Sequence, residues 1–170
     1  MTTILITGAN RGLGKETARQ LVAAGHTVYV GARDEARGRE AADELGGRFV
    51  QLDVTDDASV AAAFAQIEAD GGLDVLVNNA GIGMVALNGP DALRVFDTNA
   101  VGIIRVTEAA LPLLKRSENP VVVNISSALG SFWANHELSR RPRSTRLSST
   151  ARARRPSRCS RSSTRGPCRR

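Results

Sequence analysis

Short apolar runs alternate with longer segments of helical periodicity along residues 1–125. A β-branched run that stops at a polar residue or a glycine is typical of a strand buried on both faces of a parallel sheet. Between these runs, apolar residues recur every three or four positions, and glycines mark the helix ends. The pattern predicts five strands, at residues 3–7, 27–30, 49–52, 74–77 and 121–125.

The order of these elements indicates the fold class. Strands alternate with helices, which predicts an α/β protein with a doubly wound parallel sheet of the Rossmann type, incomplete at about five strands. Right-handed crossovers would place helices on both faces of this sheet. We expect Asn99 to precede a long helix whose buried stripe contains Ile103, Val106, Ala110 and Leu113.

The segment 135–170 differs in composition from the rest of the chain. From His136 onward it holds twelve arginines and one acidic residue, whereas residues 1–135 hold 11 basic and 16 acidic residues. Its few apolar residues follow no period, so it cannot bury enough surface to offset chain entropy. We therefore predict a domain at residues 1–134 and a disordered Arg/Ser-rich tail at residues 135–170.

Location is predicted from what residues 1–135 lack. Both cysteines, Cys159 and Cys168, lie in the tail. The first apolar stretch is too short for a signal peptide, and no run approaches the ~20 residues of a membrane span. We expect a soluble, cytoplasmic protein without a membrane partner.

A glycine loop joins the first predicted strand to the first predicted helix. It reads Thr7-Gly8-Ala9-Asn10-Arg11-Gly12-Leu13-Gly14. Glycines permit the tight turn and let the backbone approach phosphates, and a helix N-terminus offers unpaired N–H groups. This strand–loop–helix setting predicts a dinucleotide-binding domain.

Arginines near the second strand suggest which dinucleotide binds. An acidic residue at the end of that strand would mark NAD, but Ala32 and Arg33 occupy the stretch. Arg33, Arg37 and Arg11 could converge on a 2′-phosphate, which favours NADP(H) over NAD(H). Two alternatives stay open: Arg37 is a solvated helix residue, or Asp34 pairs with one of the arginines.

Four ordered motifs together resemble the short-chain dehydrogenase/reductase family. They are the glycine loop, Asn78-Asn79-Ala80-Gly81, Asn99, and Asn124-Ile125-Ser126-Ser127. The stretch Gly31-Ala32-Arg33-Asp34 with Arg37 is most similar to the NADPH-dependent carbonyl reductases of that family. The resemblance implies that Asp53 bonds the adenine and that Ala80 and Gly81 line the nicotinamide ribose. The expected cofactor-binding residues are Gly8, Asn10, Arg11, Gly12, Leu13, Gly14, Arg33, Arg37, Asp53, Val54, Asn79, Ala80 and Gly81.

The resemblance also implies a catalytic set, of which only part is present. Ser127 matches the serine that holds the carbonyl oxygen, and Asn99 matches the asparagine. The family's tyrosine and the lysine four residues after it have no counterpart, because Tyr29 is the only tyrosine and both lysines precede Ser127. A tyrosine with a pKa near ~10 needs such a cation to act near neutral pH.

The tail suggests where the missing pair went. Residues 148–157 permit the codons TCG TCT ACA GCG CGA GCA AGG CGG CCG TCN. When each codon starts one base earlier, after a Leu147 codon CTG, the bases encode V-V-Y-S-A-S-K-A-A-V. Past Cys159 the same frame permits M-L-T-V-Q-Y-A-R-A-L. The hypothesis is that the chain is out of frame from about residues 134–138 onward.

Three functions compete. The first is an oxidoreductase lineage that reduces a carbonyl or oxidises an alcohol with NADP(H), in a chain that is inactive without the tyrosine and lysine. The second is a non-catalytic NADP(H)-binding module. The third is a nucleic-acid-binding protein, because the basic tail would bind phosphate backbones. No aromatic residue follows Trp133 to stack on bases, so no specific nucleic acid is expected. The segment that would flank the helix after Asn99 in the family's usual dimer is absent, which argues against oligomerisation.

Overall fold

A computed structural model describes residues 1–83, 86 and 88–127 of the chain. The chain divides into two units, residues 1–126 and 127–170, and of the second only Ser127 is described. The predictions made for the tail therefore lie outside the described residues. The sheet, the helices and the pocket all belong to the first unit.

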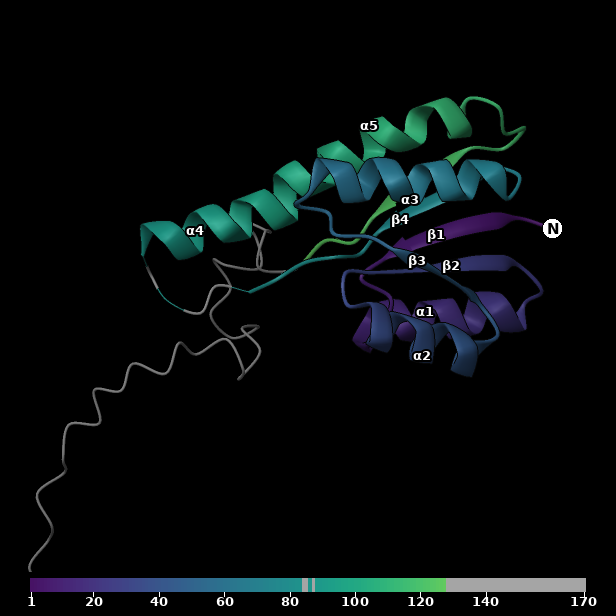
Figure 1. The fold of residues 1–170 in the computed structure, drawn as a ribbon, viewed down its shortest axis with the longest axis horizontal. Coiled ribbons are helices and arrows are strands. Elements are labelled where there is room, and N and C mark those ends of the chain that lie inside the picture. Colours follow the sequence, from purple (N-terminus) through teal and green to yellow (C-terminus); the bar gives the residue numbers. More distant parts are fainter. Residues whose placement is uncertain (84–85, 87, 128–170) are drawn as a thin grey trace, which may run out of the picture. The chain divides into compact units, whose positions relative to one another are not determined.

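The first unit is built on a five-stranded parallel sheet in the order β3-β2-β1-β4-β5 (Figure 1). The chain starts in the middle of this sheet, runs outward to β3, returns to β4 beside β1 and ends on β5. Strands are first added on one side of β1 and then on the other. This change of side is the doubly wound topology that the alternating pattern predicts. The strands are β1 Thr3–Thr7, β2 Thr27–Ala32, β3 Arg48–Gln51, β4 Val75–Asn78 and β5 Val121–Asn124.

Helices cover both faces of the sheet (Figure 1). On one face α1 and α2 pack on Ile4, Ile6, Val28 and Val30, and on the other face α3 and α5 pack on the alternate side chains of the same strands. Within the described part of the chain, no helix is apolar over enough residues to cross a bilayer. The helices are α1 Gly12–Ala23, α2 Glu35–Leu45, α3 Asp57–Ala69, α4 Gly89–Phe96 and α5 Gly102–Leu114.

Polar side chains and glycines fix the helix ends. Asp34, Asp56 and Asn88 each accept a hydrogen bond from a backbone N–H in the first turn of α2, α3 and α4, respectively. Gly46 ends α2 in a left-handed conformation with φ of 72°. These caps satisfy backbone groups that the helix itself leaves unpaired.

Asn99 precedes the long helix α5, as predicted, but no break separates that helix from α4. A π-helical turn, η1 Asp97–Val101, joins α4 to α5, and Asn99 lies in the middle of it. Of the expected buried stripe, Val106, Ala110 and Leu113 are buried against α3 and the sheet, whereas Ile103 is half-buried. Single π-turns of this kind are frequent at functional sites.

Candidate functional site

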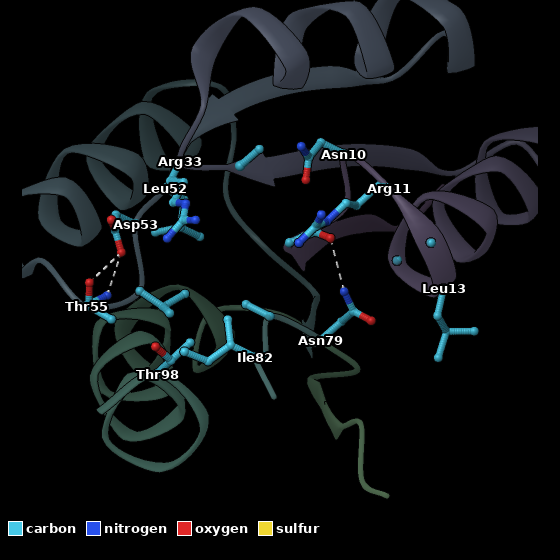
Figure 2. Close-up of a pocket in the computed structure, with 17 residues that line it drawn as sticks. Asn10, Arg11, Leu13, Arg33, Leu52, Asp53, Thr55, Asn79, Ile82 and Thr98 are labelled. Carbon is cyan, nitrogen blue, oxygen red and sulfur yellow. Dashed lines mark hydrogen bonds between the residues drawn. The ribbon is translucent and has the colours of Figure 1, made fainter. Parts of the chain in front are cut away.

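A pocket of about 340 Å³ lies where the central strands β1, β2 and β4 end (Figure 2). This is the carboxyl edge of the sheet, at the point where the strand order reverses, and open α/β sheets bind their ligands there. Its volume falls within the range of about 300–1,000 Å³ common for small-molecule sites. The lining residues are Gly8, Asn10, Arg11, Gly12, Leu13, Gly14, Ala32, Arg33, Leu52, Asp53, Val54, Thr55, Asn79, Ala80, Gly81, Ile82 and Thr98.

Twelve of the thirteen predicted cofactor-binding residues line this pocket; Arg37 does not. Both catalytic candidates fall outside the lining. Asn99 follows Thr98, the last residue of the pocket wall, and Ser127 belongs to the second unit. The residues predicted to bind the cofactor thus share one pocket, whereas the two catalytic candidates do not line it.

The three glycines of the loop differ in the space around them. Gly12 has free space beside it, whereas Gly8 and Gly14 are closely packed. Gly12 has φ of 57°, and a Cβ built there would meet nothing within 4 Å. A Cβ on Gly14 would lie 2.9 Å from the carbonyl oxygen of Gly8, and one on Gly8 would lie 3.0 Å from Ala80 Cα. Gly8 and Gly14 thus permit close packing of the loop, whereas Gly12 keeps its outer side open to a bulky group such as a phosphate.

Hydrogen bonds from β1 and the segment after β4 hold this loop in place. The buried Thr7 Oγ1 accepts from the N–H groups of Asn79 and Ala80, at 3.0 and 2.9 Å. In return, Asn79 Nδ2 donates to the carbonyl oxygen of Thr7 at 2.8 Å. It also donates to the carbonyl oxygen of Gly8 at 3.3 Å (Figure 2). The two pocket walls are therefore joined by four bonds, which fixes the position of the loop before any ligand binds.

The N-terminus of α1 opens into the pocket without a competing anion. Its N-cap residue, Arg11, makes no capping hydrogen bond with its side chain, and the first turn carries no acidic residue. The first N–H groups of the helix and the positive end of its dipole are therefore available to a phosphate. The Arg11 side chain adds a cation at the same place.

The three arginines are divided between two places. Arg33 and Arg11 line the main pocket (Figure 2), whereas Arg37 lines a neighbouring hollow between α1 and α2, together with Arg11 and Lys15. Asp34 accepts a hydrogen bond from Arg37 N at 3.0 Å, and its carboxylate lies 3.6 Å from Arg37 Nε. Asp34 is thus engaged by Arg37.

Asp53 stands as a carboxylate at the end of β3. Partial burial would raise its pKa, but bonds from Thr55 N and Thr55 Oγ1, at 2.9 and 2.7 Å, and the charges of Arg33 and Arg105 outweigh this, so its pKa is held below the usual value (Figure 2). A carboxylate accepts hydrogen bonds and does not donate them near neutral pH. It can therefore receive an amino group such as that of adenine.

Asn99 binds the loop that follows β4. Its Oδ1 accepts from Ile82 N and its Nδ2 donates to Ile82 O, both at 2.8 Å. The π-turn that carries Asn99 also places Thr98 on the pocket wall. The π-turn therefore supplies both Thr98, which lines the pocket, and Asn99, which binds the loop at Ile82.

Arg105 connects α5 to the β3–α3 loop. Its Nη1 donates to the carbonyl oxygen of Val54 at 2.7 Å, its Nε bonds Asp57, and its Nη2 lies 3.6 Å from Asp97. Val54 is a pocket residue, and the side chain of Arg105 is only 20% exposed. The guanidinium thus holds the wall of the pocket that carries Asp53.

The catalytic candidates beyond Asn99 are incomplete. Ser127 is exposed and follows β5 by three residues. Tyr29, the only tyrosine, is buried in β2, where its hydroxyl donates to Asp70 Oδ2 at 2.7 Å and accepts from Arg48. Burial and the Asp70 carboxylate raise the pKa of Tyr29. This tyrosine is part of the fold and does not line the pocket.

Sequence reasoning missed the residues that position the site. Thr7, Thr55, Thr98 and Arg105 were not selected, although each holds or lines the pocket. Thr7 carried a local signal, since it ends a strand directly before the glycine loop. Arg105 carried none, because its partner Val54 lies 51 residues away in sequence.

The family comparison matches most of the chain. Residues 2–137 match the family model described as short chain dehydrogenase. Among curated proteins, the chain is 36% identical to a (+)-neomenthol dehydrogenase of Arabidopsis thaliana, an alignment that covers 79% of this chain and 58% of that protein.

Solved structures agree with the sequence comparison. Menthone neomenthol reductase from Mentha piperita superposes with a TM-score of 0.71 at 34% identity, over 76% of this chain and 62% of that structure. An actinorhodin polyketide ketoreductase with NADPH superposes with a TM-score of 0.68 at 34% identity, over 79% of this chain and 57% of that structure. The chain thus spans somewhat more than half the length of these relatives.

Proposed function

Since this chain belongs to the short-chain dehydrogenase family of oxidoreductases, we propose that residues 1–127 are the NADP(H)-binding part of an enzyme that interconverts a carbonyl and an alcohol. The proposal depends above all on one observation. The glycine loop, the open N-terminus of α1 and the acid-free end of β2 line a single pocket. The loop and the helix N-terminus suit the pyrophosphate, and the end of β2 suits the adenosine ribose.

The residues of the pocket fit the cofactor in order. The pyrophosphate would lie over Gly12, against the first N–H groups of α1. Asp53 would accept the adenine amino group, and Ala80 and Gly81 would border the nicotinamide ribose. When bound, the nicotinamide would supply or accept the hydride. The protein's own contribution, in the described residues, is to bind and orient it.

Arg33 and Arg11 favour NADP(H) over NAD(H). A 2′-phosphate adds two negative charges beside the adenosine ribose, and two guanidinium groups line the pocket there. The acid that would bond a 2′-hydroxyl is missing from position 33, and Asp34 is turned to Arg37. The actinorhodin polyketide ketoreductase, a solved structure similar to this chain, contains NADPH, which agrees with this choice.

The proposed substrate is a small carbonyl compound or its alcohol, but the described residues lack a proton donor. Asn99 would hold the loop at Ile82, and Ser127 would bond the carbonyl oxygen. No tyrosine or lysine follows Ser127 in the sequence. We therefore expect this chain to bind the cofactor and to turn over carbonyl substrates undetectably or very slowly.

A second candidate is a non-catalytic NADP(H)-binding module. The absence of a tyrosine–lysine pair also favours this candidate. The two candidates differ in whether the intact gene encodes an active enzyme.

A nucleic-acid role for the basic tail and a cytoplasmic location stay predictions from composition. Sequence-selective DNA binding would support the nucleic-acid role. Binding to heparin that is lost at moderate salt would reflect only the charge of the tail.

The test is a comparison of cofactor affinities by isothermal titration. We expect NADPH to bind more tightly than NADH, and Arg33→Ala to weaken NADPH binding by about 10- to 100-fold, because a charge-assisted hydrogen bond contributes about 1.5–3 kcal/mol. NADH binding should change little. Arg39→Ala is a matched control, because Arg39 lies outside the pocket and pairs with Glu35. Equal affinities for the two cofactors would contradict the NADP(H) assignment.

Turnover is measured separately, with NADPH and a panel of ketones and aldehydes. The expected result is no detectable oxidation of NADPH. Turnover at rates ordinary for an enzyme of this class, about 1–10³ per second, would refute the inactivity of this chain while leaving the cofactor proposal intact.

A further inference from the structure

Strand β5 is the strand of the sheet in which every residue is exposed to solvent. Val121, Val122, Val123 and Ile125 are 45%, 41%, 39% and 40% exposed, whereas Leu76 and Val77 of the neighbouring β4 are 0% and 6% exposed. Successive residues of a strand point to opposite faces. Exposure of three successive valines therefore means that the described residues leave both faces of β5 without full cover, and among them only β4 pairs with it.

The helix beside β5 carries a second uncovered apolar surface. Ile104 and Leu111 of α5 are 65% and 42% exposed and lie two helical turns apart on one side. The other side of α5, with Val106 and Ala110, is fully buried. Together with the β5 residues, these side chains form an apolar surface that is unusual for an uncovered sheet edge.

The sequence from His136 onward is poorly suited to cover this surface. From His136 onward, twelve of its residues are arginine, and its six apolar residues are two leucines, two alanines and two cysteines. Burying arginine against valines would desolvate the charge without a partner. The apolar surface and the segment after it in sequence are therefore mismatched in chemistry.

The genetic code gives a specific reason for this mismatch. A serine codon of the TCN type places TC at the end of the codon that starts one base earlier, and NTC encodes only Phe, Leu, Ile or Val. A cysteine codon places TG there, and NTG encodes only Leu, Met or Val. An arginine codon of the CGN type gives NCG, which encodes Ala, Ser, Pro or Thr. A Ser- and Arg-rich segment thus becomes one of apolar and small residues in the shifted frame.

The shifted frame is compatible with a helix. The codons ending within Ser157, Ser160, Thr164 and Cys168 permit Val, Leu, Tyr and Leu. Their separations of three, four and four positions place them on one face of a helix. Cys159 and Ser162 also become apolar in this frame and lie off that face, so the codons permit this helix without requiring it.

We propose that the message for this chain lacks one base near codons 134–138, and that the segment encoded in the shifted frame packs on β5 and on the Ile104 side of α5. Restoring one base there would replace the arginine-rich tail with a helix that buries the bare valines. This packing is inferred from exposure and codon structure alone. One further idea does rest on the proposed function: that the tyrosine and lysine of the V-Y-S-A-S-K segment would transfer the proton.

Sequencing the genomic DNA and the message across codons 134–170 is the first test. The proposal requires T as the third base of codon 149, A as the third base of codon 153, and AGR at codon 154. These bases create the tyrosine and lysine codons of the shifted frame. A CGN codon at position 154 would overturn the proposal, because the lysine codon would then not exist.

The packing is tested by the thermal stability of two chains, the present one and the chain with one base restored. Val122→Lys should leave the present chain unchanged or less prone to associate, because Val122 already faces water. In the restored chain the same change should lower the Tm by about 5 °C or more, because it would bury a charge. Ala62→Lys on the exposed side of α3 is the control and should act equally in both chains.

Hydrogen exchange gives an independent measure if a variant fails to fold. Amides of Val121–Asn124 should exchange at least about tenfold more slowly in the restored chain than in the present one. Equal exchange in both chains, or an equal effect of Val122→Lys, would overturn the packing proposal. Neither result depends on cofactor affinity, so a failure of the NADP(H) proposal would be recognised separately from the Arg33→Ala titration.

Discussion

At the scale of single residues, the site depends on where side chains are absent as much as on where they are present. Gly12 leaves space that a phosphate would fill, and Gly14 lets the backbone of the loop approach Gly8 and Asn79. The two glycines therefore serve different purposes although they belong to one loop. The role of Gly14 can be tested by giving it a methyl group.

We expect Gly14→Ala to destabilise the protein by about 1–3 kcal/mol, since the added Cβ overlaps Gly8 O and Asn79 Nδ2 in a closely packed loop. Chemical denaturation measures the change. Gly25→Ala is a matched control outside the pocket, because its Cβ meets nothing within 4 Å and only its φ of 86° is strained. A smaller loss for Gly14→Ala than for Gly25→Ala would contradict the close packing of the loop as the source of the effect.

Asp74 makes the stability of the sheet dependent on pH. Bonds from Ser117 Oγ and Thr3 N, at 2.6 and 2.8 Å, hold its pKa below the usual value. A folded-state pKa below the unfolded one stabilises the fold at pH values above about 3.9, and this stabilisation is lost as the pH falls through the folded-state pKa. Asp74→Asn should therefore be less stable at neutral pH and should lose less stability on acidification.

Urea denaturation between pH 7 and pH 3 measures this dependence. Glu108→Gln, on the exposed side of α5, is the control and should follow the wild-type pH curve. If Asp74→Asn and wild type lost stability in parallel below pH 4, the hydrogen bonds of Asp74 would not be the source of the effect.

At the scale of elements, Arg105 links α5 and the π-turn to the loop that carries Asp53. Arg105→Ala would leave the carbonyl oxygen of Val54 without this donor and free the loop. We expect a loss of about 1–3 kcal/mol in stability and weaker binding of 2′,5′-ADP, which tests the adenosine end of the pocket alone. Thermal unfolding and calorimetric titration measure the two effects.

Arg116→Ala provides the comparison for this variant. Arg116 lies just after the end of α5 and pairs with Glu68 of α3 at 2.7 Å, but both side chains are more than half exposed. Exposed pairs contribute little, so this variant should keep its stability and its affinity for 2′,5′-ADP. Equal losses in the two variants would show that Arg105 has no special role in the pocket wall.

The elements also show how far sequence reasoning reaches. The strands and the pocket lining were predictable, because buried apolar runs and a glycine loop are local signals. The π-turn was not, since one inserted residue changes the backbone around Asn99 without changing the apolar period downstream. Whether Asp34 pairs with Arg33 or Arg37 was also undecided, because both are near it in sequence and only the cap geometry of α2 selects Arg37.

At the scale of the whole molecule, the cofactor should stabilise the first unit without protecting its edge. A ligand at 100 times its Kd stabilises a fold by about 2.7 kcal/mol. With NADPH at that excess we expect the Tm to rise by about 10–20 °C, since 1 kcal/mol corresponds to about 4–8 °C for a small domain. NADH at the same concentration should raise it less.

Hydrogen exchange shows which part of the sheet responds. Amides of β1 and β4 should gain protection on NADPH binding, because both strands end at the pocket, whereas β5 contributes no lining residue and should gain least. Protection of β5 equal to that of β1 would contradict the division between the pocket and the bare edge.

All residues that line the pocket lie between Gly8 and Thr98. All of them are therefore encoded before codons 134–138, and the altered segment contributes none of them. Ligand-based screens for folded protein, such as affinity capture on immobilised 2′,5′-ADP, would accept this chain as readily as a repaired one. Binding to such a resin therefore reports only on the pocket residues, and it gives no information about the segment encoded after them.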